Sequence, residues 1–334
     1  MRSSMSESEQ PRPGAPARSG RRPPAPPGLS PEARAYLEKN RDFPDPPPWP
    51  PLEDRAAWRE LVATTDRDLR PLFEALYPGE RLEHRELEPG GVPTYELRPR
   101  GLQPTPDEPL VLQLHGGALL MGGGELARLG AGAQAVRRAA PTWAPDYRMP
   151  PDHPFPAALD DVLAVYRAAL EKHPPGRVVV TGTSAGGNLA AALMLRARDE
   201  GLPLPAGLVL HTPQLDLTES GDSFTVLDGV DLMRPVPPVV RLYADGRDPA
   251  EPYLSPLLGD VTGFPPTLLL AGTRDLFLST TVRMHRKLLA AGVPAELHVF
   301  EAMPHGGFGG TTPEDEDLLA TVAAFERRCV GVTG

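Results

Sequence analysis

The serine of a G-x-S-x-G pattern is the residue of this chain best placed to do chemistry. Gly182, Ser184 and Gly186 form the pattern. A β-branched run at residues 177–181 precedes it, and an alanine-rich helical pattern follows at once. In this strand–turn–helix context the serine sits on a turn too sharp for ordinary side chains, with its hydroxyl above the edge of the sheet. The sequence therefore predicts a nucleophilic serine, the alternative being a glycine-rich helix start at which Ser184 is only a cap.

The hydroxyl of Ser184 is a poor nucleophile unless a base lies within hydrogen-bond reach. His305 comes shortly after the expected strand at 295–300, and Asp275 comes shortly after the expected strand at 267–271. In an open parallel sheet, ligands bind beyond the carboxyl ends of the strands. We therefore expect Ser184, Asp275 and His305 to meet on one side of the sheet, in the chain order typical of α/β-hydrolases.

Each of these groups would have a distinct task in nucleophilic catalysis. His305 can take the serine proton near neutral pH and return it to the leaving group. Asp275 can fix the imidazole tautomer and stabilise the imidazolium. The backbone amides of Gly116, Gly117 and Ala185 can point at the developing oxyanion, and glycines suit a turn that a carbonyl oxygen must approach closely.

Other histidines compete for the role of base. His298 lies inside an expected strand and His285 inside an expected helix, which favours structural roles for both. His211 ends a strand but lacks the Gly-Gly turn that follows His305. His115 precedes the two oxyanion glycines, so we expect it to orient that loop.

Other carboxylates compete for the role of acid. Besides Asp275, the candidates are Asp245, Asp248 and Asp260. The position of Asp275 directly after a strand favours it. Asp160 and Asp161 stand in the first turn of an expected helix, so we expect them to be caps or packing partners.

Patterns for metals and cofactors are missing from the sequence. It has no H-E-x-x-H and no acidic loop of calcium type. Residues 122–124 are three glycines, but no G-x-G-x-x-G follows a strand. The single cysteine, Cys329, excludes an internal disulfide and a cysteine metal cluster, and we expect it to be a packing residue. The sequence therefore predicts neither a cofactor nor a metal.

The charge and hydropathy of the chain restrict its partners. Lys and Arg number 34 against 44 Asp and Glu, a formal net charge of −10, which argues against nucleic acid and anionic membrane as partners. No apolar run approaches the ~20 residues of a membrane span. The first residues carry no apolar core of a secretory signal, so a cytoplasmic location is expected.

The remaining patterns predict a βα rhythm. The chain is long enough for one large α/β domain with insertions or for two modest domains. Residues 1–28 have almost nothing to bury and should be disordered. Helices are expected at 31–40 and within 52–76, with Leu69, Leu72 and Phe73 among the residues on apolar faces. A proline-rich connector at 43–51 separates the two.

Further strands are expected at 81–88, 92–98, 109–114, 142–147, 177–181, 207–211, 267–271 and 295–300. Further helices are expected at 125–138, 156–172, 185–200, 279–291 and 313–328. Continuous apolar strands alternating with helices mean a mostly parallel sheet covered on both faces. The proline-rich stretch 212–263 breaks the rhythm and is interpreted as an insertion over the carboxyl ends of the strands.

With these motifs the chain resembles the hormone-sensitive-lipase-like branch of the α/β-hydrolases, the bacterial family IV carboxylesterases. The resemblance runs from about residue 80 to the C-terminus. It rests on the segments 115–118, 146–148, 153–158 and 182–188, and on Asp275 and His305. Thr183 makes the resemblance closest to the GTSAGG-type subgroup.

The resemblance implies an α/β-hydrolase fold, a mostly parallel central sheet with helices on both faces and a helical cap. Residues 1–28 are then a leader, 29–80 are N-terminal helices contributing to the cap, and 81–334 are the catalytic domain with a cap insertion at about 212–263. It also implies Gly116, Gly117 and Ala185 as oxyanion donors, and often a dimer, so a homodimer is expected.

Three departures from the family pattern bear on the site. Ala118 stands where the family usually has a third glycine. His305 is followed by Gly306 and Gly307, one glycine more than usual. The glycine-rich residues 120–125 follow the oxyanion loop directly, which can alter the space for the acyl group.

The expected function is a serine hydrolase that cleaves carboxylic esters of small, mainly short-acyl substrates through an acyl-enzyme. The candidate cap has many apolar residues and few lysines, which suits a small apolar substrate. These residues are Trp49, Trp58, Phe73, Tyr77, Phe224 and Met233. Two alternatives stay open: a lactone or acetylated-metabolite hydrolase with the same triad, and a non-catalytic ligand-binding protein, which resemblance to plant hormone receptors allows.

Overall fold

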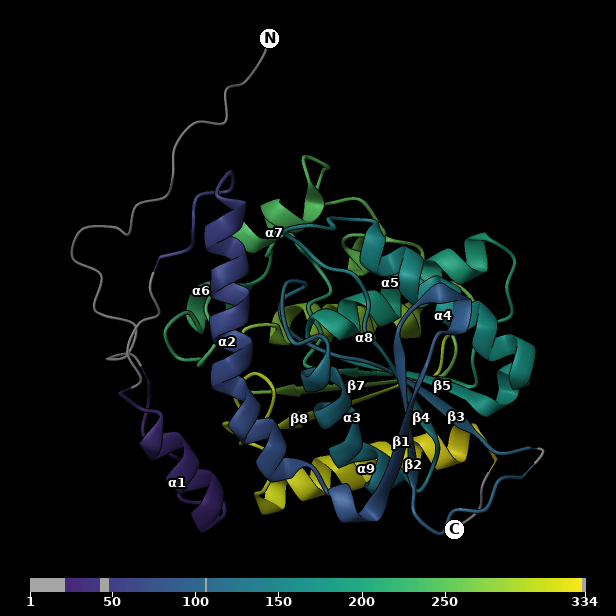
Figure 1. Cartoon of the computed structure of the whole chain (residues 1–334). Coiled ribbons are helices and arrows are strands. Elements are labelled where there is room, and N and C mark those ends of the chain that lie inside the picture. Colours follow the sequence, from purple (N-terminus) through teal and green to yellow (C-terminus); the bar gives the residue numbers. More distant parts are fainter. Residues whose placement is uncertain (1–21, 43–47, 106, 332–334) are drawn as a thin grey trace.

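The computed structural model describes residues 22–42, 48–105 and 107–331, and these form one eight-stranded sheet covered by helices (Figure 1). The strand order across the sheet is β1-β2-β4-β3-β5-β6-β7-β8. The strands are β1 (Leu82–Leu87), β2 (Thr94–Pro99), β3 (Leu110–Leu114), β4 (Thr142–Pro145), β5 (Val178–Thr183), β6 (Gly207–His211), β7 (Thr267–Gly272) and β8 (Ala295–Phe300). Strands β3 to β8 run parallel, and β2 is antiparallel to both β1 and β4. The predicted mostly parallel sheet is therefore confirmed.

Helices cover both faces of this sheet. They are α1 (Pro31–Lys39), α2 (Arg55–Leu76), α3 (Glu125–Arg138), α4 (Ala157–Lys172), α5 (Ala185–Asp199), α6 (Asp222–Val226), α7 (Pro237–Ala244), α8 (Leu278–Ala290) and α9 (Pro313–Cys329). Figure 1 shows α3 and α9 below the strands and α4, α5 and α8 above them. The arrangement is the one that continuous apolar strands require, because both of their faces must be buried.

The central strand β5 illustrates how the two faces are filled. Val178 and Val180 belong to the large core under α4, α5 and α8, whereas Val179 belongs to the smaller core under α9. All three are at most 1% exposed. The side-chain alternation of a strand thus connects two separate cores through one rigid element, and this element ends at Ser184.

Helix α2 docks on α3 through two rings. The ring of Phe73 lies over Gly130, and that of Tyr77 lies over Gly132, where any larger side chain would collide with it. Leu69 and Leu72, expected on apolar faces, are instead 36% and 47% exposed. Adjacent helix residues point about 100° apart, so docking Phe73 turns Leu72 towards solvent. Phe73 and Tyr77 therefore attach α2 to α3, and the expected placing of Leu69 and Leu72 on a buried apolar face is wrong.

The segment before α1 contacts the domain. Residues 1–21 of the expected leader lie outside the described residues, as do residues 43–47 of the expected connector. Residues 22–28 were expected to be disordered too, but the guanidinium of Arg274 donates hydrogen bonds to the carbonyls of Pro23 and Pro24 at 3.1 and 2.8 Å. Because Arg274 is 9% exposed, it buries its charge against these carbonyls and fixes the segment. The expected boundary at residue 28 is therefore wrong for residues 22–28.

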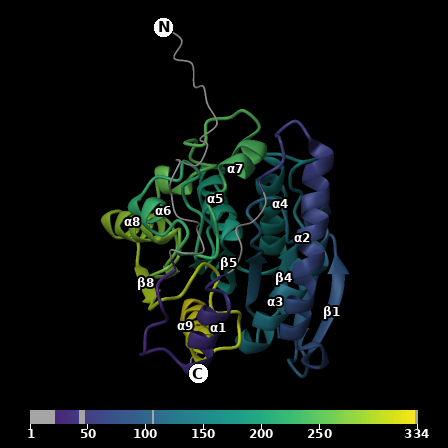
Figure 2. The same cartoon turned by 90° about the vertical axis from the view of Figure 1, so that its left-hand side faces the viewer.

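The 212–263 insertion and the N-terminal region meet above the sheet. Trp49 stacks on Trp58 of α2 with ring centroids 5.8 Å apart, and the Arg234 guanidinium lies over the Trp49 ring at 3.7 Å. Figure 2, turned by 90°, again places α7 beside the upper end of α2. Two stretches far apart in the sequence are thus joined by a stacked aromatic–cation group.

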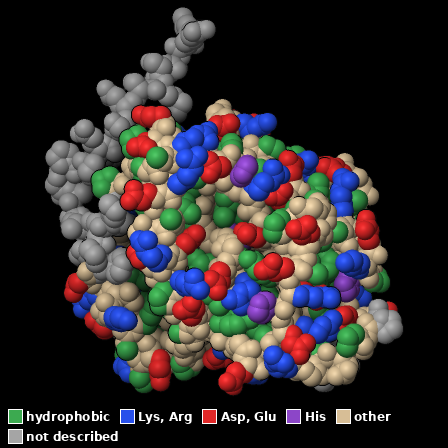
Figure 3. All heavy atoms as spheres, in the orientation of Figure 1, with side chains coloured by type: hydrophobic (Ala, Val, Ile, Leu, Met, Phe, Trp, Pro, Cys, Tyr) green, Lys and Arg blue, Asp and Glu red, His purple; other side chains and the backbone are tan. Residues whose placement is uncertain are grey.

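Among the described residues, no helix combines the length and the apolar character that crossing a bilayer would take. On the face shown in Figure 3, acidic and basic side chains are interspersed.

Candidate active site

Ser184 sits at a strained turn between β5 and α5. Its φ and ψ are 56° and −119°, a conformation that side chains rarely adopt. The flanking glycines permit it: a Cβ on Gly182 would lie 2.1 Å from the carbonyl oxygen of Gly186, and one on Gly186 would lie 2.1 Å from that of Leu114. The Ser184 amide donates to the carbonyl of His211 at 2.9 Å, which ties the turn to the neighbouring strand β6.

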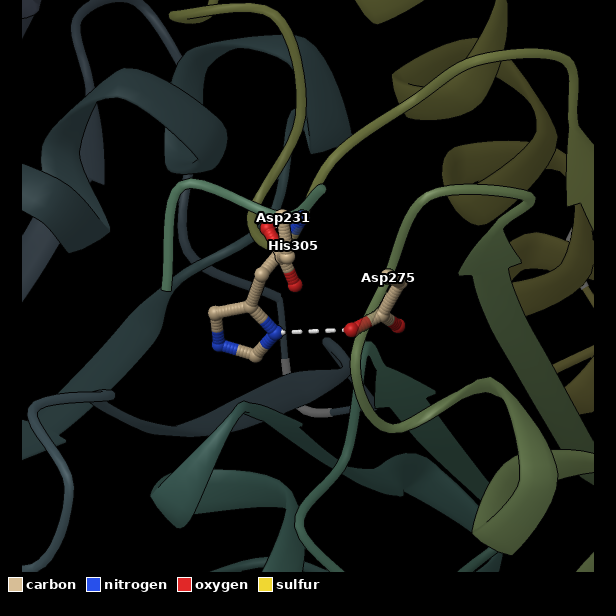
Figure 4. A group of neighbouring side chains, drawn as sticks. All are labelled: Asp231, Asp275 and His305. Carbon is tan, nitrogen blue, oxygen red and sulfur yellow. Dashed lines mark hydrogen bonds and ion pairs between the residues drawn. The ribbon is translucent and has the colours of Figure 1, made fainter. Parts of the chain in front are cut away.

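Three side chains from three separate strand ends form a hydrogen-bonded line. His305 Nε2 lies 2.8 Å from Ser184 Oγ, and His305 Nδ1 lies 3.0 Å from Asp275 Oδ1. Asp275 is fully buried and Ser184 is 7% exposed. Asp275 Oδ1 also accepts the amide of Phe277 at 3.0 Å, and the Phe277 ring meets the imidazole edge-on at 4.9 Å. Figure 4 shows the bond between the acid and the ring. An Nδ1–H donor to Asp275 leaves Nε2 free to accept the serine proton.

The electrostatics of the line favour charge on the imidazole. Burial alone would lower the pKa of His305, but the hydrogen bond and charge of Asp275, together with the charge of Asp231, raise this pKa above its ordinary value. His211, also buried, is lowered to a pKa of about 4 by burial and by the nearby His305. His211 therefore stays neutral near pH 7, whereas His305 is the histidine prepared to carry a proton.

The loop after β3 brings unused amides to Ser184. A Cβ on Gly116 would lie 3.3 Å from Ser184 Cβ, and Gly117 has a φ of 126°, which favours glycine. Within the described residues, the amides of Gly116 and Gly117 make no hydrogen bond, and that of Ala185 opens α5, where a helix leaves amides without intrahelical partners. Ala118, which replaces the usual third glycine, has a φ of 57°. The departure at residue 118 therefore places an alanine in a strained backbone conformation.

The 146–148 motif supports this loop from behind. Tyr147 donates its hydroxyl proton to the carbonyl of His115 at 2.6 Å and stacks on the His115 ring at 4.1 Å. Asp146 accepts the amide of Gly124 at 2.8 Å, and Asp66 of α2 accepts that of Gly122 at 3.0 Å. The expected role of His115 as a loop-orienting residue fits these contacts, and the glycine-rich stretch is held by two carboxylates.

The competing residues lie in other surroundings. Asp161 pairs with Arg148 at 2.7 Å and Asp160 pairs with Arg196 at 2.8 Å, so both are packing partners, as expected. His285 Nε2 lies 3.3 Å from the carbonyl oxygen of Ala295, to which it can donate, and His298 is exposed on the edge strand β8. None of the three competing acids is hydrogen-bonded to a histidine in the part of the chain that the structure describes; they are Asp245, Asp248 and Asp260.

Asp231 is a member of the site that the sequence did not suggest. Its carboxylate lies with Asp275 and His305 in a group whose ligand atoms are all within 4.8 Å of one another. Burial, with the charge of Asp275, raises the pKa of Asp231 to about 6, although His305 opposes the shift. Both imidazole nitrogens are engaged by Asp275 and Ser184, so this donor set is arranged for proton transfer rather than for holding a metal. Asp231 follows no strand, and this explains why no pattern indicated it.

Comparison with known proteins agrees with this geometry. The sequence model of a family described as having the alpha/beta hydrolase fold matches residues 111–308. An acetyl-hydrolase of Streptomyces hygroscopicus is 36% identical over 231 residues, which are 66% of this chain and 76% of that protein. The crystal structure of an esterase, E25, aligns with a TM-score of 0.83 at 35% identity, over 92% of this chain and 97% of that one.

A further solved structure, described as an esterase from the bacterial hormone-sensitive lipase family, aligns with a TM-score of 0.76 at 29% identity, over 90% of this chain and 99% of that one. The family match covers more than half of the chain and includes Ser184, Asp275 and His305. The chain therefore belongs to the α/β-hydrolase fold family, in its hormone-sensitive-lipase-like branch.

Proposed function

We propose that this protein is a serine hydrolase of small carboxylic esters, with Ser184, His305 and Asp275 as its triad. The observation that carries the proposal is the 2.8 Å contact between Ser184 Oγ and His305 Nε2, with Asp275 on the opposite ring nitrogen at 3.0 Å. A hydroxyl that can hand its proton to an oriented imidazole is an activated nucleophile. The esterases among its relatives support the choice of an ester as substrate.

In the proposed reaction Ser184 Oγ attacks the ester carbonyl carbon while its proton passes to His305 Nε2. The carbonyl oxygen becomes an oxyanion, which accepts hydrogen bonds from the amides of Gly116, Gly117 and Ala185. The imidazolium, stabilised by Asp275, then protonates the departing alkoxide and leaves an acyl-enzyme. Water attacks this ester, gives its proton to His305, and the acid departs as Ser184 regains the proton.

Residues 29–80 and the 212–263 insertion are proposed to form a cap over the site. The Trp49–Trp58 stack under Arg234 supports this, because it joins both parts. Trp58 is fully buried, so the stack anchors the cap. We infer that a cap fixed in this way restricts the room for the acyl group, which would favour short chains.

A panel of p-nitrophenyl esters from acetyl to dodecanoyl tests the substrate class. The highest kcat/KM is expected among the short acyl chains. Highest kcat/KM on the longest chains would contradict the small acyl site, and no turnover of any ester by folded protein would contradict the esterase itself.

A second candidate substrate is an acetylated metabolite, favoured by the 36% identical relative that is named an acetyl-hydrolase. The chemistry is unchanged, because acetate is the smallest common acyl group. Adding acetylated alcohols and amines, and lactones, to the same panel separates this candidate from simple esters. A ligand-binding role without catalysis is disfavoured by His305, which lies at hydrogen-bond distance from Ser184.

A further inference from the structure

A second buried carboxylate lies beside the proposed triad and comes from a different part of the fold. Asp231 belongs to the 212–263 insertion, between α6 and α7, and is 1% exposed. Figure 4 shows it next to His305, while Asp275 reaches the ring from another loop. Burying a carboxylate is costly unless hydrogen bonds compensate it, so its partners indicate its task.

One partner is local, the amide of Met233, which donates to Asp231 Oδ1 at 3.3 Å. The other two are backbone amides of the loops that carry the acid and the base. Asp231 Oδ2 accepts the amide of Leu276, the residue after Asp275, at 2.7 Å. Asp231 Oδ1 accepts the amide of His305 itself at 3.1 Å. Hydrogen bonds to an ionised acceptor are about twice as strong as neutral ones. One carboxylate therefore bridges the loop after β7 and the loop after β8.

We propose that Asp231 is a positioning residue for the ester hydrolysis proposed above, on which this inference rests. Its carboxylate clamps the Asp275 loop to the His305 loop and places a second negative charge beside the imidazole. The insertion, which covers the site, thereby also sets the geometry of the acid–base pair.

The effect on proton affinity has a definite sign. The groups facing Asp231 and His305 are Asp275, the neutral His211, Tyr36 of α1, and the guanidinium of Arg22, which donates to the Asp231 carbonyl at 3.5 Å. The negative charges of Asp275 and Asp231 raise the pKa of His305. Removing the charge of Asp231 must therefore lower the pKa of His305, and the acid limb of kcat/KM must move to lower pH.

Two variants separate the hydrogen bonds that Asp231 makes to the two loops from the effect of its negative charge on His305. Asp231→Ala removes both, so kcat should fall at least about 10-fold while KM for a short ester changes less than about 3-fold, because misplacement affects the chemical step. Asp231→Asn keeps one of the two acceptor oxygens, so its kcat should lie between those of Asp231→Ala and the wild type. Both variants should show the acid limb displaced to lower pH.

Asp222→Asn is the matched control, since it removes an exposed carboxylate from the same insertion. It should leave kcat and the acid limb unchanged. A folded Asp231→Asn with an unmoved acid limb, or an Asp231→Ala with wild-type kcat, would overturn the proposal. Circular dichroism and the thermal midpoint show whether each variant is folded. If Asp231→Ala does not fold, the proposal is tested with Asp231→Asn alone.

An NMR titration keeps this test separate from the esterase proposal. The imidazole signal of His305, assigned by its loss in His305→Ala, should titrate at lower pH in Asp231→Asn than in the wild type. If the wild type hydrolyses no ester but this displacement is seen, the proposed function fails and the role of Asp231 in setting the imidazole stands. If esters are hydrolysed but the titration is unmoved, the role of Asp231 fails alone.

Discussion

At the scale of single residues, Ser184 and His305 are proposed to act as one unit, because the serine hydroxyl lies 2.8 Å from the imidazole nitrogen that would take its proton. Ser184→Ala and His305→Ala should therefore each remove nearly the whole rate enhancement in kcat. The double variant should be little slower than either single one, because groups that act as a unit are not additive. Steady-state kinetics on one short ester measure all three. Losses that multiply in the double variant would show that the two side chains act independently.

Ala118 carries strain that can be relieved. Its φ of 57° lies in the region where glycine is favoured, and such a residue costs on the order of 1–3 kcal/mol. Ala118→Gly should therefore raise the free energy of unfolding by about 1 kcal/mol, the strain outweighing the entropy that glycine adds to the unfolded chain. Urea denaturation measures it. Ala133→Gly in α3 is the control of opposite sign, and a destabilised Ala118→Gly would show that the strain is absent.

The raised pKa of the Glu219 carboxyl leads us to expect that the free energy of unfolding depends on pH. Burial, aided by Asp228 and Asp216, raises the pKa of Glu219 to about 7 from the ordinary 4.5. The folded state then holds the proton more tightly than the unfolded one, so stability is highest below the unfolded pKa and falls as pH rises through about 7. At about 1.4 kcal/mol per pKa unit, Glu219→Gln should gain up to about 3 kcal/mol at alkaline pH.

Urea midpoints at acidic and alkaline pH test this prediction. The gain of Glu219→Gln should be seen at about pH 8 and be absent at about pH 4. Gln can still accept the amide of Val236, which Glu219 binds at 2.8 Å, so the contact itself is kept. Glu171→Gln, an exposed change on α4, is the control and should leave both midpoints unchanged. If Glu219→Gln gained equal stability at both pH values, proton binding by Glu219 would not be the cause of the gain.

The sequence indicated the candidate triad because each of its members lies at or shortly after the end of a strand. A parallel sheet brings strand ends together, so position along the chain was enough to group Ser184, Asp275 and His305. Asp231 could not be found this way, since it lies in an irregular insertion and its contacts depend on how that insertion folds back. The support of the loop at residues 115–117 by Tyr147 was likewise a matter of packing that no local pattern encodes.

At the scale of elements, α1 depends on one cap that also binds another helix. Ser30 Oγ accepts the amide of Ala33 at 3.1 Å and donates to Glu314 of α9 at 2.7 Å. Ser30→Ala should lower the free energy of unfolding by about 1–2 kcal/mol, because it removes the cap and leaves Glu314 one partner short. Thermal melting measures the change. Ser30→Thr, which keeps the hydroxyl, is the control, and equal melting of the two variants would contradict the role of the cap.

Element boundaries followed the sequence where local chemistry decides them. Helix α3 spans residues 125–138 and α1 begins at residue 31, both as predicted, and the cap of α1 is Ser30. The strand expected at 142–147 ends at Pro145, because Tyr147 turns to bind the His115 carbonyl. The exposed face of α2 was mispredicted for a similar reason: its apolar pattern fits several orientations, and only the fit of Phe73 over Gly130 selects one.

At the scale of the whole molecule, the fold class was predictable because continuous apolar strands alternating with helices allow few other arrangements. The cap, the homodimer and the cytoplasmic location stay predictions. The net charge of −10 and the interspersed charges of the face in Figure 3 agree with a small-molecule substrate rather than a polyanion.

Labelling with a fluorophosphonate tests the proposed triad most directly, because this reagent traps only a serine whose proton a neighbouring base removes. Peptide mass spectrometry should place one adduct on Ser184, and Ser184→Ala should carry none. His305→Ala should label far more slowly than the wild type. A folded wild-type protein without an adduct, or with its adduct on another residue, would contradict Ser184 as the nucleophile.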